Sequence, residues 1–350
     1  MEQQSVSAHP DPSRIMQVGM GFWASKALLA AVNFKLFTSL AGTSKKAKAI
    51  KDELHLNTTD RHVYDWLDVL VSLGFLKREG LLENAAYSNN ADTEMFLDEN
   101  KPSFIGGILK MGNNRLYQFW GNLEQGLLTG KPQNESKDST NMHFFEDLYQ
   151  SPEKLREFVN AMSGIQGGNF MTLSKKFDFS KYKTMADIGG ADGFLSCMIA
   201  LQHPSISLTT YDLPPVAPLA EKKIAKFNLT GKIKVESGDF LKDAIPSAEI
   251  ISMGNILHGL NEATKLELIK KVYDALPENG IFIAIENVID NDRSNNTFGM
   301  LMSLNMLIEN GDGFDYTFND FAKWAKDTGF TKTELIPLTG PASAAIAYKS

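Results

Sequence analysis

Short apolar runs alternate with helical segments from residue 183 to the end of the chain, and this alternation constrains the fold more than any other feature of the sequence. We predict amphipathic helices such as 262–276 between strands at 184–188, 207–211, 232–236, 249–253 and 280–285. Two more helices, 295–309 and 318–328, and closing strands near 331–337 and 344–348 follow. Because repeated strand–helix units form parallel sheets, the sequence predicts an α/β domain with helices on both faces of a doubly wound sheet.

The first half of the chain has a different texture and is mainly helical. Apolar residues recur at helical spacing over 19–36, but this helix has a thin polar face, so we expect another surface, such as a second subunit, to cover it. Helices at 47–54 and 60–73, a tight turn at Gly74 and a two-stranded wing ending at 85–88 follow. This order is typical of a winged-helix module.

The charge of this module argues against DNA as its partner. Its recognition helix, 60–73, carries Asp60, Asp65 and Asp68 against Arg61 and His62. Phosphate neutralisation supplies most of the non-specific affinity for DNA, and the whole chain has a formal net charge of −7. We therefore expect a structural or dimerising role for the module and no nucleic acid partner.

Cysteine and histidine usage and the lengths of apolar runs bear on location and partners. The single cysteine, Cys197, leaves no intramolecular disulfide, and the opening MEQQSVSAHPDPSR lacks the apolar core of a signal peptide. Uninterrupted apolar runs fall short of the roughly 20 residues that span a bilayer. No metal-site spacing connects the histidines His9, His55, His62, His143 and His203. We expect a cytoplasmic protein with neither a membrane partner nor a metal.

A glycine-rich loop follows the first strand of the predicted sheet. Residues 187–193 read Asp-Ile-Gly-Gly-Ala-Asp-Gly, and the next helix begins near Phe194. Such a loop lets the backbone approach a ligand, and the helix start offers unpaired N–H groups. Because doubly wound sheets bind ligands at the carboxyl ends of their strands, the residues at the other strand ends decide which ligand fits.

The next three strand ends carry side chains that suit a nucleoside with a cationic sulfonium. Asp212 lies 25 residues beyond the start of the loop, where a carboxylate can bind ribose hydroxyls. The following ends carry Asp239 with Phe240, and His258. A nicotinamide-binding fold usually spaces its glycines as G-x-G-x-x-G, whereas this loop has two adjacent glycines. S-adenosylmethionine therefore fits better than a nicotinamide cofactor, which leaves a nicotinamide-dependent reductase as an alternative.

From about residue 15 to its end, the chain resembles the bacterial and plant class I O-methyltransferases of the caffeate/acetylserotonin type. The matching stretches are FWGNLEQGLLTGKP, FVNAMSG, ADIGGADG, YDLPPV, ESGDFLKD, GNILHGLNE, ALPENGIFIAIENVI and YTFNDFAKWAKDTGF. The resemblance implies a homodimer and a Rossmann-like sheet of order 3-2-1-4-5-7-6 that binds S-adenosylmethionine. We expect a winged-helix dimerisation domain at 1–110, a helical connector contributing to the substrate pocket at 111–177, and the methyltransferase domain at 178–350.

The resemblance also implies roles for individual residues. Those expected to bind the cofactor are Asp187, Gly189, Gly190, Gly193, Asp212, Leu213, Asp239, Phe240, Gly254 and Asn255. The loop glycines would lie near the methionine portion, Asp212 at the ribose, and Asp239 with Phe240 around the adenine. His258 is expected to be the general base, with Glu286 and Asp315 as its acidic partners. A neutral imidazole activates a hydroxyl, and a carboxylate on its other nitrogen fixes the tautomer.

The expected acceptor pocket combines the connector with the helix after the fifth strand of the sheet. Its candidate lining residues are Trp120, Phe144, Met162, Met302, Asn305 and Met306. These side chains predict a soft, mostly apolar pocket for a small aromatic or secondary metabolite. The expected reaction is methyl transfer from S-adenosylmethionine to a hydroxyl of that metabolite.

Two departures from the family pattern keep other functions open. Gly259 and Leu260 follow His258 where relatives commonly have Asp-Trp, and Gly254 stands where the plant type has Lys. One alternative is S-methylation of a small thioether or thiol acid, because a sulfide nucleophile needs no base. Others are a non-methylating reaction on the same scaffold and a winged-helix regulator that senses S-adenosylmethionine.

Overall fold

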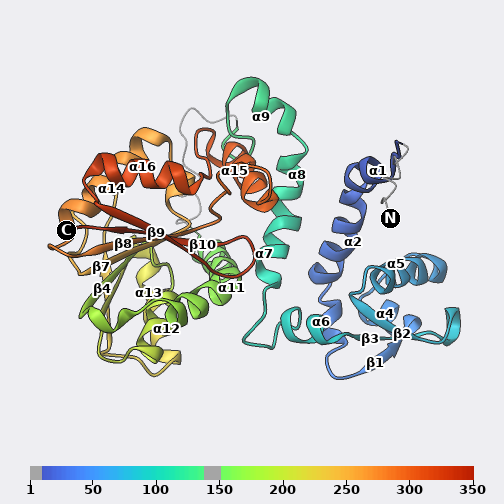
Figure 1. Cartoon of the computed structure of the whole chain (residues 1–350). Coiled ribbons are helices and arrows are strands. Elements are labelled where there is room, and N and C mark those ends of the chain that lie inside the picture. Colours follow the sequence, from blue (N-terminus) through green and yellow to red (C-terminus); the bar gives the residue numbers. More distant parts are fainter. Residues whose placement is uncertain (1–9, 138–150) are drawn as a thin grey trace, which may run out of the picture. The chain divides into compact units, whose positions relative to one another are not determined.

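The computed structural model describes residues 10–137 and 151–350. The chain divides into two compact units, Met1–Asn114 and Arg115–Ser350 (Figure 1). A short π-helical turn, η2 (Gly112–Leu116), spans the boundary between them. Each unit has its own buried apolar core.

The first unit is a helical module with a small antiparallel sheet. Its helices and one helical turn are α1 (Ser13–Gly19), α2 (Gly21–Asn33), α3 (Leu36–Ser39), α4 (Ala47–Glu53), α5 (Asp60–Ser72), η1 (Leu82–Asn84), α6 (Ala91–Phe96) and α7 (Gly106–Met111). Its strands are β1 (Ser44–Lys46), β2 (Leu76–Glu79) and β3 (Ala86–Asn89), in the order β1-β3-β2. Fully buried residues such as Phe37, Leu67 and Tyr87 form its core.

The structure differs from the sequence-based expectations for this unit in two places. The wing has a third strand, because β1 pairs with β3 through Ser44 and Ser88; three residues are too short to show the alternation of a strand. The helix expected over 19–36 is shorter in the structure, because it is interrupted at Met20 and ends at Asn33, two residues before a left-handed Lys35. Gly19 and Gly21 flank Met20, and glycine is a poor helix former.

Apolar side chains on α1 and α2 remain exposed, and we call Ile15, Val18 and Trp23 the α1–α2 face. Their exposed fractions are 75%, 75% and 64%. In the part of the chain that the structure describes, Ser13–Asn33 is also the one helical stretch long and apolar enough to cross a membrane, by length and composition only. The estimate from uninterrupted apolar runs missed this stretch because polar residues break it up. A helix that packs against another protein surface has the same composition.

The second unit is built on a seven-stranded sheet. Its strands are β4 (Thr184–Ile188), β5 (Ser207–Asp212), β6 (Ile233–Ser237), β7 (Ile250–Gly254), β8 (Ile281–Glu286), β9 (Lys332–Pro337) and β10 (Ser343–Tyr348). They follow the order β6-β5-β4-β7-β8-β10-β9, and only β10 runs antiparallel to its neighbours β8 and β9. Numbered within the sheet, this order is 3-2-1-4-5-7-6, so the predicted α/β class and strand order are confirmed.

Helices cover both faces of this sheet (Figure 1). The helices and turns of the unit are α8 (Tyr117–Trp120), α9 (Leu123–Thr129), α11 (Pro152–Lys176), η3 (Phe179–Lys181), α12 (Phe194–Gln202), η4 (Pro214–Val216), α13 (Ala217–Lys226), η5 (Leu257–Gly259), α14 (Glu262–Ala275), α15 (Thr297–Asn310) and α16 (Phe318–Thr328). Strand β8 is wholly buried: Ile283 belongs to the apolar cluster that includes residues of α11, α12 and α13, and Phe282 to the cluster that includes residues of α14 and α16. Since β4 to β8 are parallel, the loops after them share one edge.

Candidate functional site

The glycine loop (residues 188–193) joins β4 to α12 and is bent by left-handed backbone. Gly189 has φ 68°, and a Cβ there would lie 2.6 Å from Ile256 Cδ1. A Cβ on Gly190 would collide with the Thr210 hydroxyl, so both positions need glycine. The Gly189 and Gly190 N–H groups donate to the Tyr211 carbonyl, 2.8 Å and 3.2 Å away. The loop therefore lies directly against the end of β5.

Asp212, one of the expected cofactor residues, ties this loop to the end of β5. The Ala191 N–H donates to Asp212 Oδ2 at 2.8 Å, and the Leu213 N–H donates to Asp212 Oδ1 at 2.7 Å. Burial outweighs these bonds and raises the pKa of Asp212. Asp187 is 3% exposed, accepts a 2.7 Å hydrogen bond from the Ser252 hydroxyl, and has its pKa raised to about 7 by burial. Asp187 thus lies inside the sheet, while Asp212 lies at its edge.

The other expected cofactor residues lie at the ends of β6 and β7. Phe240 is half-buried, and its ring passes 3.8 Å from the Cβ position of Gly189. Lys242 pairs with Asp239 at 3.0 Å and, against the effect of partial burial, holds the pKa of that carboxyl below its usual range. Gly254 ends β7, and the next residue, Asn255, has φ 53° and a buried Oδ1 without a hydrogen-bond partner. A buried, unpaired amide oxygen beside the glycine loop is suited to binding a polar ligand group.

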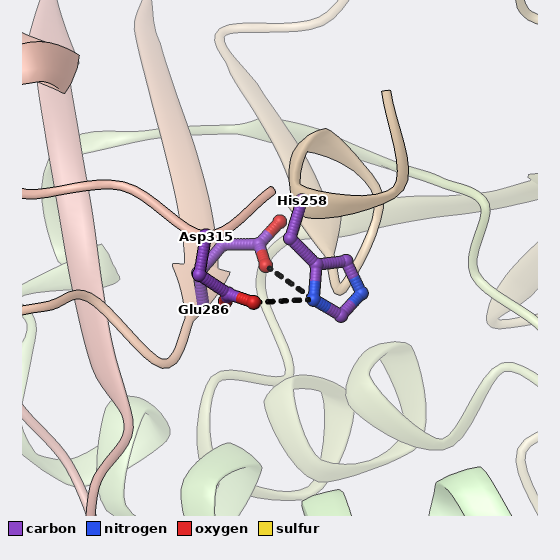
Figure 2. Close-up of side chains that lie close together, drawn as sticks. All are labelled: His258, Glu286 and Asp315. Atoms are coloured by element: carbon purple, nitrogen blue, oxygen red, sulfur yellow. Dashed lines mark ion pairs between the residues drawn. The ribbon is translucent and has the colours of Figure 1, made fainter. Parts of the chain in front are cut away.

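His258, Glu286 and Asp315 come together from three separate segments (Figure 2). His258 lies in η5, Glu286 ends β8, and Asp315 lies between α15 and α16. His258 Nδ1 is 3.4 Å from Asp315 Oδ2 and 3.8 Å from Glu286 Oε2. All three side chains are buried, and Figure 2 shows the second ring nitrogen, Nε2, turned away from both carboxylates. Nε2 therefore remains available to a group on the other side of the ring.

Glu286 also fixes the backbone that carries the histidine. Its Oε1 accepts hydrogen bonds from the Ile256 and Leu257 N–H groups, at 3.1 Å and 3.0 Å. These bonds hold the base loop (residues 255–261) against the end of β8. Because the Ile256 side chain also approaches Gly189, the base loop and the glycine loop are in contact.

The charges of this cluster shift its proton affinities. Burial by itself would lower the pKa of His258, but the negative charges of Glu286 and Asp315 outweigh it and raise that pKa to about 9. Burial also raises the pKa of the Glu286 carboxyl, to about 7. Such perturbed values in a buried cluster are typical of acid–base sites.

The spacing of His258, Glu286 and Asp315 would by itself also allow these side chains to bind a cation. Within the described ranges, 10–137 and 151–350, their ligand atoms form a group in which all distances are at most 4.8 Å. One histidine with two carboxylates can bind divalent metals. The expectation that no metal is used therefore stays a prediction, and chelation tests it.

Several expected pocket residues gather around α15. The Trp120 indole N–H donates to Asn305 Oδ1 at 2.8 Å, and Asn305 Nδ2 lies 4.0 Å from the Met302 sulfur. The Asn310 amide contacts the Met306 sulfur at 3.7 Å and donates to the Gly259 carbonyl at 3.1 Å, which connects α15 to the base loop.

The remaining two expected pocket residues, Met162 and Phe144, stay predictions. Met162 is half-buried on α11. Phe144 lies outside the described residues.

The sequence-based assignment missed one bridge that supports the glycine loop. Asp192 is 2% exposed; its Oδ1 accepts a 2.6 Å hydrogen bond from the Ser163 hydroxyl, and its Oδ2 lies 2.8 Å from Lys223 Nζ. Helices α11 and α13 are thereby tied to the loop. The sequence feature that could have indicated this bridge is the acidic residue Asp192, directly before Gly193, the last glycine of the loop.

Two family models match this chain. The O-methyltransferase domain matches residues 120–331, and the O-methyltransferase dimerisation domain matches residues 16–99. The tetracenomycin polyketide synthesis 8-O-methyl transferase TcmO of Streptomyces glaucescens is 32% identical, over 97% of this chain and 97% of its own length.

Two solved structures agree closely with the whole chain. Human N-acetylserotonin methyltransferase in complex with SAM is 25% identical, covers 98% of this chain and 99% of its own, and has a TM-score of 0.89. PigF with SAH, a methyl transferase of Serratia, is 26% identical, covers 97% of this chain and 100% of its own, and has a TM-score of 0.85.

The electrostatics of the cluster predict a shift when one carboxylate is neutralised. In Glu286→Gln, the backbone bonds to Oε1 are retained but a negative charge beside the imidazolium is lost, so the pKa of His258 should fall from about 9. NMR titration of histidine-labelled protein measures this, with His258→Gln identifying the resonance. A wild-type pKa at or below the ordinary value of about 6.5 would contradict the geometry.

Proposed function

Because the chain belongs to the S-adenosylmethionine-dependent O-methyltransferase family, we propose that it methylates a hydroxyl of a small aromatic metabolite with His258 as the general base. The observation that carries this proposal is the buried imidazole whose Nδ1 faces two carboxylates while its Nε2 points away from them. This is the arrangement in which a carboxylate orients a histidine and stabilises its protonated form.

The strand ends fit the cofactor. The glycine loop allows close backbone approach, Asp212 retains further lone pairs on both oxygens for ribose hydroxyls, and Phe240 offers an apolar wall beside the loop. We assign the methionine portion to the glycine loop, with Asn255 close by. Asp187 lies inside the sheet directly before the loop, where its bond to Ser252 ties β4 to β7.

His258 is placed to remove the proton of the acceptor hydroxyl. S-adenosylmethionine, when bound, supplies a methyl carbon on a cationic sulfur that a nucleophilic oxygen attacks directly. A phenol with a pKa near 10 is mostly protonated at neutral pH, so Nε2 increases its nucleophilicity by accepting the proton as the bond forms. The resulting imidazolium is stabilised by Glu286 and Asp315. Alignment of the acceptor oxygen is worth more still, roughly 7–11 kcal/mol.

Only the neutral imidazole can act as a base, so the raised pKa of His258 has a consequence for the rate. The rate should increase with pH until the imidazole is deprotonated, near the pKa of about 9 in the free protein. An additional positive charge close to the ring makes the imidazolium less favourable, so this limb should move to lower pH when the cationic cofactor is bound.

The pocket residues support an aromatic acceptor. Trp120, Met302 and Met306 provide flat and polarizable apolar surfaces, and Asn305 adds a polar group on the same helix face. The relative TcmO is an 8-O-methyl transferase of tetracenomycin polyketide synthesis, which agrees with a small-metabolite acceptor for this chain.

The α1–α2 face supports a homodimer. It exposes Val18 and Trp23 within the segment that matches the dimerisation domain, and Ile15 directly before that segment. A contiguous exposed apolar face of this kind usually marks an interface. A second copy of the chain is the partner that we propose for it.

We predict that His258→Ala retains its affinity for S-adenosylhomocysteine and loses at least roughly tenfold in kcat on a hydroxyl acceptor, since a positioned base contributes roughly 10²–10⁴-fold. Steady-state kinetics and calorimetry measure the two quantities, with His62→Ala on α5 as the control. EDTA should leave the wild-type rate unchanged. Unchanged turnover in His258→Ala would indicate sulfur methylation or another base.

We predict that Asp212→Asn weakens S-adenosylhomocysteine binding about tenfold, since the loss of a hydrogen bond to a charged group costs about 1.5 kcal/mol. Calorimetry with the full-length protein measures this, and Asp178→Asn, which alters an exposed turn, should bind like wild type. NADH should not bind. Binding of NADH without binding of S-adenosylhomocysteine would contradict the assignment of the site.

We predict that the double variant Ile15→Glu, Val18→Glu is monomeric, because two charges on the α1–α2 face would be buried without partners in a dimer. Light scattering after size exclusion gives the mass. The matched control is Leu201→Glu on α12, which is 51% exposed and lies in the other unit. A dimeric double variant, or a monomeric wild type, would refute this interface.

A further inference from the structure

Lys265 on α14 is completely buried, at 0% exposure, although lysine is rarely found inside a protein without a partner. Its ammonium donates a 2.5 Å hydrogen bond to the Leu260 carbonyl and lies 3.2 Å from the centre of the Phe314 ring. The Trp324 ring is 5.7 Å away. A carbonyl and two aromatic faces therefore take the place of water around this cation.

The two closest partners of Lys265 belong to the segments that carry the catalytic groups. Leu260 lies two residues after His258 in the base loop, and Phe314 lies directly before Asp315. The acidic segment (residues 311–316) is thus joined to the base loop through one ammonium group. Lys265 itself occupies neither segment.

Other contacts show that these two segments are packed as one piece. Asn261 Nδ2 donates to Asp312 Oδ2 at 2.9 Å. A Cβ on Gly313 would lie 2.8 Å from the His258 carbonyl oxygen, so the two backbones are in direct contact. Any change in the register of these segments would alter the position of the imidazole relative to Asp315.

The charge of Lys265 also opposes that of the buried carboxylates. Glu286, Asp315, Glu262 and Asp312 all act on the ammonium, and the neighbouring Tyr316 hydroxyl is buried and neutral. Burial outweighs these charges and lowers the pKa of Lys265 to about 8. Its positive charge in turn lowers the pKa of His258.

We propose that Lys265 is a positioning residue of the active site: its ammonium fixes the base loop against the acidic segment and offsets the carboxylates around His258. This inference rests on the proposed role of His258 as the base. The offset matters because, without it, the two carboxylates would hold the proton on the imidazole still more tightly, and a protonated imidazole cannot accept the acceptor's proton. Lys265 itself does not contact the reacting groups.

Two substitutions separate the two parts of this role. Lys265→Gln keeps a donor for the Leu260 carbonyl but removes the charge. Below about pH 8, where the wild-type ammonium is charged, kcat/KM should therefore fall by up to roughly tenfold, and the two pH profiles should converge at higher pH, with the high-pH plateau of kcat near wild type. Lys265→Met removes both the hydrogen-bond donor and the charge, so kcat should fall at every pH. Its affinity for S-adenosylhomocysteine should be unchanged. Lys265→Arg keeps the charge and should keep the wild-type pH profile.

The matched control is Lys270→Met on the same helix, where an exposed lysine pairs with Asp274. If Lys265→Met does not fold, as judged by circular dichroism, the Gln and Arg variants still decide the outcome. A wild-type pH profile of kcat/KM in Lys265→Gln would overturn the proposal. A loss of cofactor affinity in parallel with kcat in Lys265→Met would overturn it too. If Lys265→Gln behaves like wild type while His258→Ala is inactive, only the role of Lys265 is rejected. If His258→Ala is fully active, the general base itself is rejected.

Discussion

The buried carboxylate of Glu286 is the constraint on which the rest of the site depends. One of its oxygens accepts the N–H groups of Ile256 and Leu257, and the other lies 3.8 Å from the His258 imidazole. Because Glu286 ends β8, a strand buried along its whole length, its position is set by the sheet. The sheet thereby determines where the histidine lies.

Burying this charge is costly, and the surrounding groups reduce the cost. Backbone donors, the imidazole and the ammonium of Lys265 all favour the ionised carboxylate, while burial raises its pKa to about 7. In this site, the negative carboxylate and the positive imidazolium and ammonium groups therefore offset one another in apolar surroundings. The polar atoms of the site are incompletely paired: His258 Nδ1, Glu286 Oε2 and both oxygens of Asp315 make no regular hydrogen bond. Catalytic hydrogen bonds often shorten only when the substrate is bound.

The sheet could be predicted from the sequence because continuous apolar runs such as 281–286 recur between helical segments, which is typical of buried parallel strands, and the shared edge of the strand ends follows from it. The sequence also indicated which residues lie at those ends, including Asp212 and His258. It did not indicate the three-residue strand β1 or the helix break at Met20, since both depend on pairing and on local glycines. Lys265 was missed because an isolated lysine in an amphipathic helix normally faces solvent, and only the packing of α14 against α16 shows that it is buried.

The central claim is that the His258 imidazole removes the proton of the acceptor hydroxyl. Its most direct test compares a phenol that the enzyme methylates with a ring-fluorinated analogue that is already ionised at the assay pH, in wild type and in His258→Ala. The account predicts a large loss of kcat for the phenol in the variant and little loss for the ionised analogue, because the analogue has no proton to remove. Equal losses for both acceptors would contradict the account.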